Sequence, residues 1–396
     1  MAERALSGLT VLDISENISG PYCTKLLADY GATVIKVEKP VTGDASRQTG
    51  PFPDDNPDIE KSGLFLFLNT SKKSITLDID NKDARDIFKR LVKHADIVVE
   101  NFKPGTMKKL GLDYAALKRY KSDIIMASIS YFGQTGPRRD WNGCDLVAQA
   151  MGGVMHLTGD PEHEPLKLPL SQAEYQAGLN AAVAILCAIY HRDATSEGQY
   201  IDISAQETVA SILEGAISTY SYSGKALNRN GVRHRYKCPS TIMKAKDGYV
   251  HMETSAYWDH FATMVKAPEL MQPRLASILR YKHADEVEDA IRPWVERHTA
   301  DEIFAAGQEW RTPVAKVIGV EELGSDPQYE ARNYFQDIDH PQAGRLTYPS
   351  APFRMSETPA EINRAPLLGE HNDEIYCDLL KLNRDELAKL KERDVI

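Results

Sequence analysis

The first candidate for chemistry is the carboxylate of Glu174, which stands four residues before Gly178. Residues 179–190 are apolar and rich in alanine, a composition that predicts a helix buried on nearly every side. A carboxylate just before or within the first turn of such a helix is stabilised by the helix dipole and by unpaired N–H groups. Burial there can also tune its reactivity, so Glu174 is either a reactive carboxylate or a plain first-turn helix acid.

Further candidates stand in a loop directly after a predicted strand, where α/β folds bind ligands. Asn101 and Phe102 could hold an adenine or a pantetheine group by hydrogen bonding and stacking, or could simply form the turn before the next helix. Lys103 and Lys109, together with Lys39 after an earlier strand, could contact phosphates as point charges or remain solvated.

The stretches 131–137 and 142–145 hold further candidates. Gly133 and Gly136 allow the backbone of the first stretch to lie close to a ligand or to form a tight turn. Cys144 could be a nucleophile, but no histidine stands at an informative spacing, which favours a packed thiol. His156 and His163 could act as bases, although their place beside a turn favours plain surface residues. The sequence shows neither a metal-ligand constellation nor a GxSxG motif.

The composition is that of an ordinary globular protein, with 42% hydrophobic and 26% charged residues in a chain of 396. This length predicts two or more domains. The apolar runs are shorter than a membrane span and residues 1–6 lack an apolar signal core, which predicts a cytoplasmic protein without a membrane segment. The net charge of −10 argues against a general nucleic-acid binder but allows a local basic site for one anionic cofactor. The five scattered cysteines predict free thiols.

Strand and helix patterns alternate along the first half of the chain. Strands are predicted at 6–14, 33–38, 74–79, 95–100 and 123–130, and helices at 21–30, 83–94, 106–120 (broken by Gly111) and 176–191. This alternation predicts an α/β fold with a Rossmann-like, doubly wound parallel sheet. No GxGxxG motif follows the first strand, so nothing points to a dinucleotide.

The second half of the chain changes character. A helix is predicted at 206–222, and the basic, turn-rich residues after it lead into a hairpin at 241–253. Helices are then predicted at 257–265, 284–296 and 300–308, followed by a strand at 312–319 and a C-terminal pair of helices. Residues 226–330 are therefore predicted to form a small α+β domain, with linkers at 201–225 and 331–339.

Seven motifs, in order, make the chain similar to a known family. They lie at residues 19–21 with 27–32, at 34–38 with Gly43, Asp44 and Arg47, at 69–78, at 100–105 with 110–112, at 130–137, at 198–199 with 202–204, and at 368–371. With these motifs the chain resembles the class III coenzyme A transferases, which include formyl-CoA:oxalate and carnitine CoA-transferases and α-methylacyl-CoA racemase. The resemblance runs nearly from end to end.

The resemblance implies how the chain is organised and where it binds coenzyme A. It implies a large Rossmann-like domain built from both chain ends, residues 1–200 and 340–396, a small middle domain, and an interlocked homodimer. No tightly bound cofactor is implied, because coenzyme A and acyl-CoA are substrates together with a small carboxylic acid. The implied CoA-binding residues are Ile18, Ser19, Lys39, Leu77, Asn101, Phe102, Lys103, Lys109, Asn142 and Cys144.

The resemblance also assigns the nucleophile. The transferases carry an aspartate four residues before the glycine that opens the alanine-rich helix, and Glu174 occupies this position. The expected reaction moves CoA from an acyl-CoA to a carboxylic acid through an acyl-glutamyl anhydride and a glutamyl-CoA thioester. Asp145 is expected to face Glu174 and to raise its pKa or orient it. Backbone N–H groups at the helix start, with Gln134 or the Gly133 backbone, are expected to stabilise the oxyanions.

Two alternatives stay open. An acyl-CoA racemase needs a second base, and Cys144 stands where racemases of the family carry a histidine, although a thiol is poorly suited to this proton abstraction. The other alternative is a non-catalytic CoA-binding subunit that partners an active homologue, in which Glu174 would merely be tolerated. Oxalate is disfavoured as an acceptor, because the hairpin at 244–253 lacks the glycine-rich loop of the formyl-CoA:oxalate enzymes.

Overall fold

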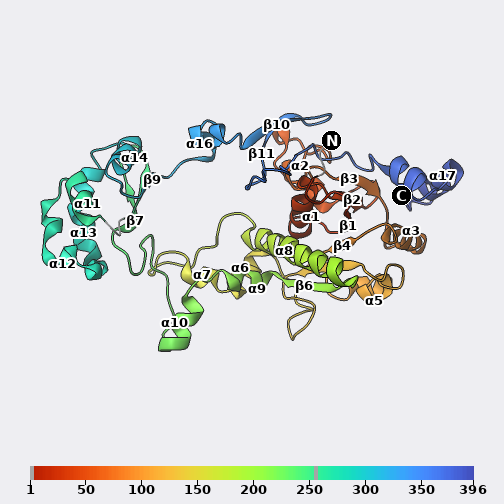
Figure 1. Cartoon of the computed structure of the whole chain (residues 1–396), viewed down its shortest axis with the longest axis horizontal. Helices are drawn as coiled ribbons and strands as arrows, with labels where there is room; N and C mark the ends of the chain where they lie inside the picture. The colour runs from red at the N-terminus through yellow and green to blue at the C-terminus, as the bar shows by residue number, and fades with distance from the viewer. Residues whose placement is uncertain (1–3, 254–256) are drawn as a thin grey trace. The chain divides into compact units, whose positions relative to one another are not determined.

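The computed structural model describes residues 4–253 and 257–396. The chain divides into two units, which Figure 1 draws coloured along the sequence. Unit 1 consists of Met1–Val154, Leu168–Glu214 and Glu330–Ile396, and unit 2 consists of Met155–Lys167 and Gly215–Tyr329. Unit 1 is therefore assembled from three stretches that are far apart in the sequence.

A six-stranded parallel sheet forms the centre of unit 1, in the order β3-β2-β1-β4-β5-β6. Its strands are β1 (Thr10–Asp13), β2 (Thr33–Glu38), β3 (Lys73–Thr76), β4 (Ile97–Glu100), β5 (Ile125–Ser130) and β6 (Tyr200–Ser204). The winding direction reverses between β1 and β4, and open parallel sheets bind ligands beyond the carboxyl ends of the strands at such a switch point. The predicted α/β fold with a parallel sheet is confirmed.

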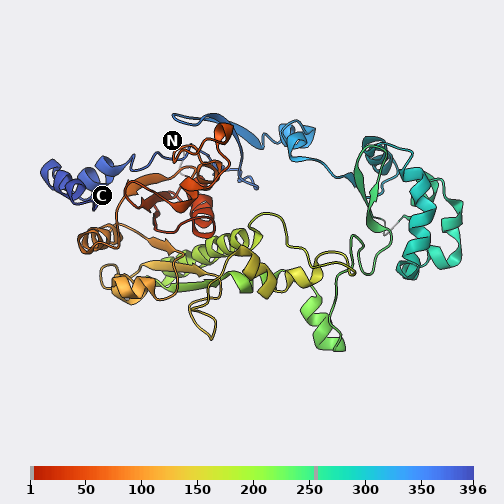
Figure 2. The same ribbon diagram turned by 180° about the vertical axis from the view of Figure 1, so that it is seen from behind.

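Helices cover both faces of this sheet (Figure 1, Figure 2). The helices of unit 1 are α1 (Ser19–Asp29), α2 (Gly63–Leu68), α3 (Lys82–Val92), α4 (Thr106–Leu110), α5 (Tyr114–Leu117), α6 (Asp145–Met151), α8 (Gln172–Thr195), α9 (Ala205–Ser211) and α17 (Arg384–Glu392), with a π-helix at Glu374–Leu379. Successive strand residues point to opposite faces of a sheet. Val11 therefore packs against α1 and α8, whereas its neighbour Leu12 packs against α3 and the π-helix.

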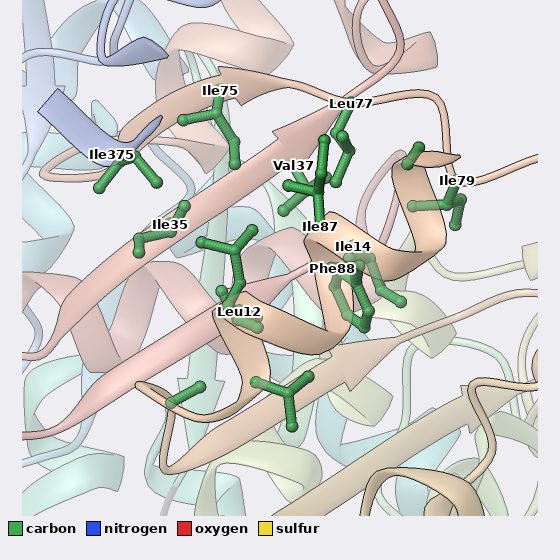
Figure 3. Packing of buried hydrophobic residues seen from close by; sticks show 14 of the residues in the cluster. Leu12, Ile14, Ile35, Val37, Ile75, Leu77, Ile79, Ile87, Phe88 and Ile375 are labelled. Atoms are coloured by element: carbon green, nitrogen blue, oxygen red, sulfur yellow. The ribbon is translucent and has the colours of Figure 1, made fainter. Parts of the chain in front are cut away.

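Figure 3 shows the cluster on the α3 side of the sheet. Leu12, Ile35 and Ile75 come from three neighbouring strands, and they gather with Phe88 of α3. Ile375 joins them from the π-helix, so the C-terminal segment completes this layer of the core. Burial of these side chains is the main favourable term that fixes the sheet and therefore the loops at its carboxyl edge.

Helix α8 crosses α1 at very close range on the other face. A side chain on Gly178 would place its Cβ 2.4 Å from the carbonyl oxygen of Ser19, so only glycine fits at this crossing. The helix begins at Gln172, earlier than the predicted start at 176, and Glu174 consequently lies within its first turn.

The prediction that this helix is buried on nearly every side is wrong for the single chain. Its outer face exposes Leu179, Val183, Leu186 and Tyr190, with Val183 54% and Tyr190 80% exposed. These residues recur at helical spacing, opposite the alanines that pack on the sheet. An apolar composition all round a helix does not reveal which of its faces the same chain covers.

Unit 2 contains a three-stranded antiparallel sheet in the order β7-β8-β9. Its elements are α7 (Val154–Leu157), α10 (Ala216–Ser223), β7 (Ser240–Lys244), β8 (Tyr249–Glu253), α11 (Trp258–Met264), α12 (Pro273–Ala276), α13 (Ala284–Val295), α14 (Ala300–Glu309), β9 (Val314–Lys316), α15 (Val320–Leu323) and α16 (Pro327–Ala331). Phe261 of α11 and Ile291 of α13 are buried in its core. The predicted hairpin and the three helices after it are confirmed.

Three expectations about the connecting segments are corrected. The helix predicted at 206–222 is two helices, α9 and α10, because the chain breaks where Glu214 takes a left-handed conformation with φ of 50°. The linker predicted at 331–339 contains β10 (Phe335–His340), which pairs antiparallel with β11 (Gly344–Pro349). In the linker predicted at 201–225, β6 is the edge strand of the large sheet. The remaining domain boundaries stay predictions.

Candidate active site

A cavity of about 190 Å³ lies at the carboxyl ends of β1, β4 and β5, beside the first residues of α1 and α8. This is the switch point of the sheet. Its polar lining residues are Glu16, Asn17, Ser19, Asn101, Lys103, Ser130, Tyr131, Arg139, Asn142 and Glu174, and its aromatic ones also include Phe102, Phe132 and Trp141. A concave site with a few convergent polar groups on an apolar wall is the usual form of a small-molecule site.

Asp145 ties the first turn of α8 to the start of α6. Its Oδ1 accepts hydrogen bonds from the backbone N–H groups of Ala173 at 2.8 Å and Glu174 at 3.2 Å. Its Oδ2 accepts another from Gln149 Nε2 at 2.6 Å. First-turn N–H groups have no partner within their own helix, and a carboxylate there also interacts favourably with the helix dipole. Asp145 therefore fixes the backbone of Glu174.

Tyr131 contacts the carboxylate of Glu174 itself. Its Oη donates a hydrogen bond of 2.8 Å to Glu174 Oε1. Tyr131 directly follows β5, and its ring lies against Gly143, where an added Cβ would stand 2.5 Å from the ring carbon Cγ. Only glycine at position 143 therefore lets this loop pack on the ring.

The surroundings of Glu174 disfavour its ionised form. Burial raises the pKa of its carboxyl, the Tyr131 hydrogen bond lowers it, and the charge of Asp145 raises it again, with a net rise. Glu174 forms no ion pair with a lysine or arginine in the described part of the chain. Its carboxylate thus combines a raised pKa with access to a cavity, which is the common condition of a reactive acid.

The loop between β1 and α1 forms one wall of the cavity and is held from two sides. Asn101 Oδ1 accepts from the Glu16 N–H at 2.8 Å, and Asn101 Nδ2 donates to the Glu16 carbonyl at 2.7 Å. Asp44 Oδ1 accepts from the Asn17 N–H at 3.0 Å. Asn101 therefore braces the cavity wall, and its contact with CoA stays a prediction.

Buried charges lie behind this loop. Asp13, the last residue of β1, has an oxygen 3.0 Å from Lys72 Nζ and 3.8 Å from Lys36 Nζ. Lys36 is also 2.6 Å from Asp44 and donates to the carbonyl of Ser15. Burial alone would raise the pKa of Asp13, but the two lysines and neighbouring hydroxyl groups hold it well below its usual range.

The structure brings five of the ten predicted CoA-binding residues to the cavity. They are Ser19, Asn101, Phe102, Lys103 and Asn142. Lys103 Nζ donates to Asn142 Oδ1 at 2.7 Å, which joins the loop after β4 to the loop before α6. These contacts place the residues together, and their binding of CoA stays a prediction.

The other five predicted residues lie outside the cavity lining. Ile18 precedes α1, Cys144 precedes α6, and Lys39 and Lys109 are exposed to solvent. The Leu77 side chain packs in the hydrophobic core with 1% of its surface exposed, which leaves it no face for a ligand. The burial of Leu77 therefore does not support the predicted contact of its side chain with CoA.

Three of the backbone N–H groups near the expected oxyanion site donate to carboxylates. The N–H groups of Ala173 and Glu174 donate to Asp145. The Gln134 N–H donates to both carboxylate oxygens of Asp202 at 3.0 Å, and the Gln134 side chain lines a neighbouring hollow instead of this cavity. These three N–H groups therefore do not donate to Glu174, and the role of the Gln134 side chain and the Gly133 backbone stays a prediction.

Sequence reasoning missed several residues of the cavity wall, namely Glu16, Tyr131, Arg139 and Trp141. Two of them had a usable signal, because Glu16 and Tyr131 follow predicted strands at the carboxyl edge of the sheet. Arg139 and Trp141 stand in an irregular loop, and no periodicity or turn motif indicates that it folds back over the cavity.

Residues 4–253 and 257–396 contain no group of three or more His, Cys, Asp or Glu side chains that could hold a metal ion. None of the helices within these ranges is both long enough and apolar enough to cross a membrane.

Known proteins match this chain over nearly its whole length. The model of CoA-transferase family III matches residues 6–372. Succinyl-CoA–D-citramalate CoA-transferase of Chloroflexus aurantiacus is 35% identical over 99% of this chain and 98% of its own. Succinyl-CoA:mesaconate CoA-transferase of Haloarcula hispanica is 35% identical over 94% of this chain and 95% of its own.

A solved structure shows the same fold. The crystal structure of a CAIB/BAIF family protein from Brucella suis matches with a TM-score of 0.85 at 31% identity, covering 95% of this chain and 100% of that one. The resemblance drawn from the motifs is confirmed, and so is the predicted enzyme class, a CoA-transferase. The chain therefore belongs to CoA-transferase family III.

Proposed function

We propose that this chain moves coenzyme A from an acyl-CoA to a carboxylic acid, with Glu174 as the nucleophile. The observation that carries the proposal is the position of Glu174. Its carboxylate lines the cavity at the switch point of the sheet, with a raised pKa and with no paired cation among the described residues. A carboxylate in such a place is able to attack a thioester and to form a covalent intermediate.

The proposed reaction has four steps. Glu174 attacks the donor thioester and releases CoA thiolate, which leaves an acyl-glutamyl anhydride. The thiolate attacks the glutamyl carbonyl, so that the donor acid leaves and a glutamyl-CoA thioester remains. The acceptor carboxylate attacks this thioester and again releases the thiolate, which finally attacks the acceptor carbonyl of the second anhydride. One acceptor oxygen therefore stays on Glu174, and one Glu174 oxygen leaves with the donor acid.

Succinyl-CoA is the proposed donor, and the acceptor is a small carboxylic acid. The three relatives that are 35% identical carry succinyl-CoA in their names, with D-citramalate or mesaconate as its partner. Lys103 and Arg139 line the same cavity as Glu174 and supply positive charge for anionic substrates. The five predicted CoA-binding residues in the cavity wall would hold the CoA part, with exposed Lys39 and Lys109 available to its phosphates.

We further propose that the protein is an interlocked cytoplasmic homodimer with a large domain built from both chain ends. The outer face of α8 supports a second copy, because Leu179, Val183, Leu186 and Tyr190 form an exposed apolar stripe on it. Light scattering is expected to give twice the chain mass of 44.2 kDa. Val183→Glu should shift the protein toward monomer, and a wild-type monomer would contradict this part of the proposal.

The nucleophile is tested by trapping. The protein is incubated with succinyl-CoA and hydroxylamine in the absence of an acceptor, and its peptides are examined by mass spectrometry. A hydroxamate is expected on Glu174, because hydroxylamine cleaves both the anhydride and the thioester. Glu174→Gln should give no adduct, whereas the control Glu197→Gln, an exposed carboxylate just beyond the far end of α8, should react like the wild type.

The alternatives are separated by two further readouts of the incubation with succinyl-CoA, namely bound CoA and exchange of the proton alpha to the thioester. Bound CoA without any adduct would identify a non-catalytic subunit. Exchange of the proton alpha to the thioester in the absence of an acceptor would identify a racemase. Either result would overturn the proposed transfer through Glu174.

A further inference from the structure

We propose that Tyr131 is a catalytic hydrogen-bond donor that holds one carboxyl oxygen of Glu174 and stabilises the negative charge on it as the glutamyl-CoA thioester forms and breaks. This inference rests on the proposed function, because it assigns a role at the same nucleophile. It assigns a side-chain donor to Glu174, because the N–H groups of Ala173, Glu174 and Gln134 donate to other carboxylates in the folded protein.

The hydrogen bond between the two side chains is direct. Tyr131 Oη lies 2.8 Å from Glu174 Oε1, although the residues are 43 positions apart in the sequence. The donor comes from the end of β5 and the acceptor from the first turn of α8, so two rigid elements set their distance. Groups fixed in this way need little reorganisation when charge develops during the reaction.

Tyr131 is held from several directions. Its carbonyl accepts a hydrogen bond of 3.0 Å from the N–H of Gln206. Its ring is covered by Gly143, where any side chain would collide with it. Burial and the neighbouring Glu174 raise the pKa of Tyr131 well above its usual range, so the hydroxyl keeps its proton and serves as a donor.

Several other donors near Glu174 bind different groups, whereas the Ser130 hydroxyl in the same cavity wall has no partner among the described residues. The Ala173 and Glu174 N–H groups both donate to Asp145 Oδ1. Of the side-chain donors that line the cavity, Lys103 donates to Asn142 and Arg139 to Asp140. Within the described residues, Tyr131 is thus the side chain found bonded to the Glu174 carboxyl.

This arrangement divides the two carboxyl oxygens between two tasks. Tyr131 holds Oε1, which leaves Oε2 to attack the donor thioester. When the thiolate attacks the anhydride, and again when the acceptor attacks the glutamyl thioester, the glutamyl carbonyl oxygen gains negative charge. The hydrogen bond from Tyr131 shortens and strengthens as this charge grows, because charge-assisted bonds are the stronger ones. The proton stays on Tyr131 throughout, and the charge leaves with the departing thiolate or carboxylate.

Tyr131→Phe tests this inference, because it removes the hydroxyl and keeps the ring against Gly143. The glutamyl-CoA enzyme is formed with succinyl-CoA, freed of excess donor and mixed with acceptor, and the breakdown of the covalent thioester is followed. Loss of one oxyanion donor should slow the breakdown by about 100-fold or more. The steady-state kcat should fall likewise, with little change in KM, because the interaction strengthens only in the transition state.

Tyr175→Phe is the matched control. Tyr175 follows Glu174 in the same helical turn, but its ring packs edge-on against Tyr22 with ring centroids 4.8 Å apart. This variant should break down at the wild-type rate, and melting curves should show that both variants are folded. Equal breakdown rates in the two variants would overturn the role of Tyr131 and leave the proposed function standing. Absence of a glutamyl adduct in the wild type would instead overturn the proposed function.

If Tyr131→Phe does not fold, fluorinated tyrosine incorporated in place of tyrosine keeps the question answerable. Fluorination makes the hydroxyl more acidic and leaves the ring in place. A breakdown rate that changes with the acidity of the hydroxyl to the same extent in the wild-type background and in Tyr175→Phe cannot arise from Tyr175. No dependence on the acidity in either background would count against the inference.

Discussion

Two carboxylates near the carboxyl edge of the large sheet have opposite surroundings. Asp13 is fully buried, pairs with Lys36 and Lys72, and has a pKa held well below its usual range. Glu174 is partly buried at a cavity, has a tyrosine hydroxyl as its side-chain partner, and has a raised pKa. Burial raises the pKa of both carboxyls. The pKa of Asp13 is nevertheless lowered, mainly because two lysines lie beside it, whereas no lysine pairs with Glu174 in the described part of the chain.

The difference separates a structural carboxylate from a reactive one. The charge of a carboxylate that is paired with buried cations holds neighbouring elements of the fold together. A carboxylate that is desolvated without a cation retains the tendency to react with a proton or a carbonyl carbon. Substitutions at the two sites should therefore separate activity from stability.

The largest effect is expected for Glu174→Gln. Removal of the nucleophile should lower the rate of CoA transfer at least about 1,000-fold. A carboxyl with a raised folded-state pKa destabilises the fold where it is ionised, so this variant should melt at the wild-type temperature or above it at neutral pH. Steady-state transfer and thermal melting measure the two effects. A near-normal rate of CoA transfer in Glu174→Gln would contradict the assignment of Glu174 as the reactive carboxylate and Asp13 as the structural one.

Asp13→Asn should give the opposite result. It leaves Lys36 and Lys72 with one buried anion fewer, which should cost about 3–5 kcal/mol in the free energy of unfolding. The exposed pair of Asp86 and Lys89 offers a control, since Asp86→Asn should change stability by about 0.5 kcal/mol or less. Urea denaturation measures both variants, and equal losses would contradict the assigned role of the buried cluster.

The stabilisation that Asp13 contributes should depend on pH. The folded-state pKa of Asp13 is lowered, so its stabilisation is present above the unfolded value near ~4 and is lost as the pH falls toward the folded value. The gap in stability between the wild type and Asp13→Asn should therefore narrow as the solution is acidified below about pH 4.

Glu174→Asp should have an intermediate effect on activity. The shorter side chain withdraws the carboxylate from Tyr131 by roughly 1 Å or more, and a misplacement of this size can cost about 100-fold in rate. The measurement is kcat with saturating donor and acceptor. A large rise in rate would mean that the site is not adapted to glutamate.

The smallest of these effects is expected for Gly178→Ala. Its Cβ would overlap the Ser19 carbonyl, so α8 must move away from α1 at a cost of about 1–3 kcal/mol. The control Gly324→Ala adds a methyl group in open space at a negative φ and should be nearly neutral. A neutral Gly178→Ala would mean that the crossing does not position Glu174.

Much of the fold followed from local patterns. The alternation of strands and helices, the hairpin at 241–253 and the helix behind Glu174 depend on residues close together in sequence, and these predictions are confirmed. Glu174 could be singled out because it stands four residues before the glycine of the alanine-rich helix, where the similar transferases carry an aspartate. The break between α9 and α10 had a weaker signal, since it depends on the backbone conformation of Glu214.

The rest depended on contacts between distant parts of the chain. Tyr131 contacts Glu174 only because the end of β5 and the first turn of α8 lie at the same edge of the sheet. Asp13, Lys36 and Lys72 meet only when β1, β2 and the residues before β3 lie together, and none of them carries a local signal for burial. The exposed stripe of α8 could not be foreseen either, because composition does not show what covers a helix.

The most direct test of the central claim follows oxygen atoms. An acceptor acid labelled with ¹⁸O in both carboxylate oxygens is converted by the wild-type enzyme, and the peptide that contains Glu174 is then examined by mass spectrometry. The proposed chemistry predicts that one ¹⁸O atom moves to the Glu174 carboxylate, because the acceptor oxygen bridges the second anhydride. Turnover that leaves Glu174 unlabelled would contradict a covalent role for this residue.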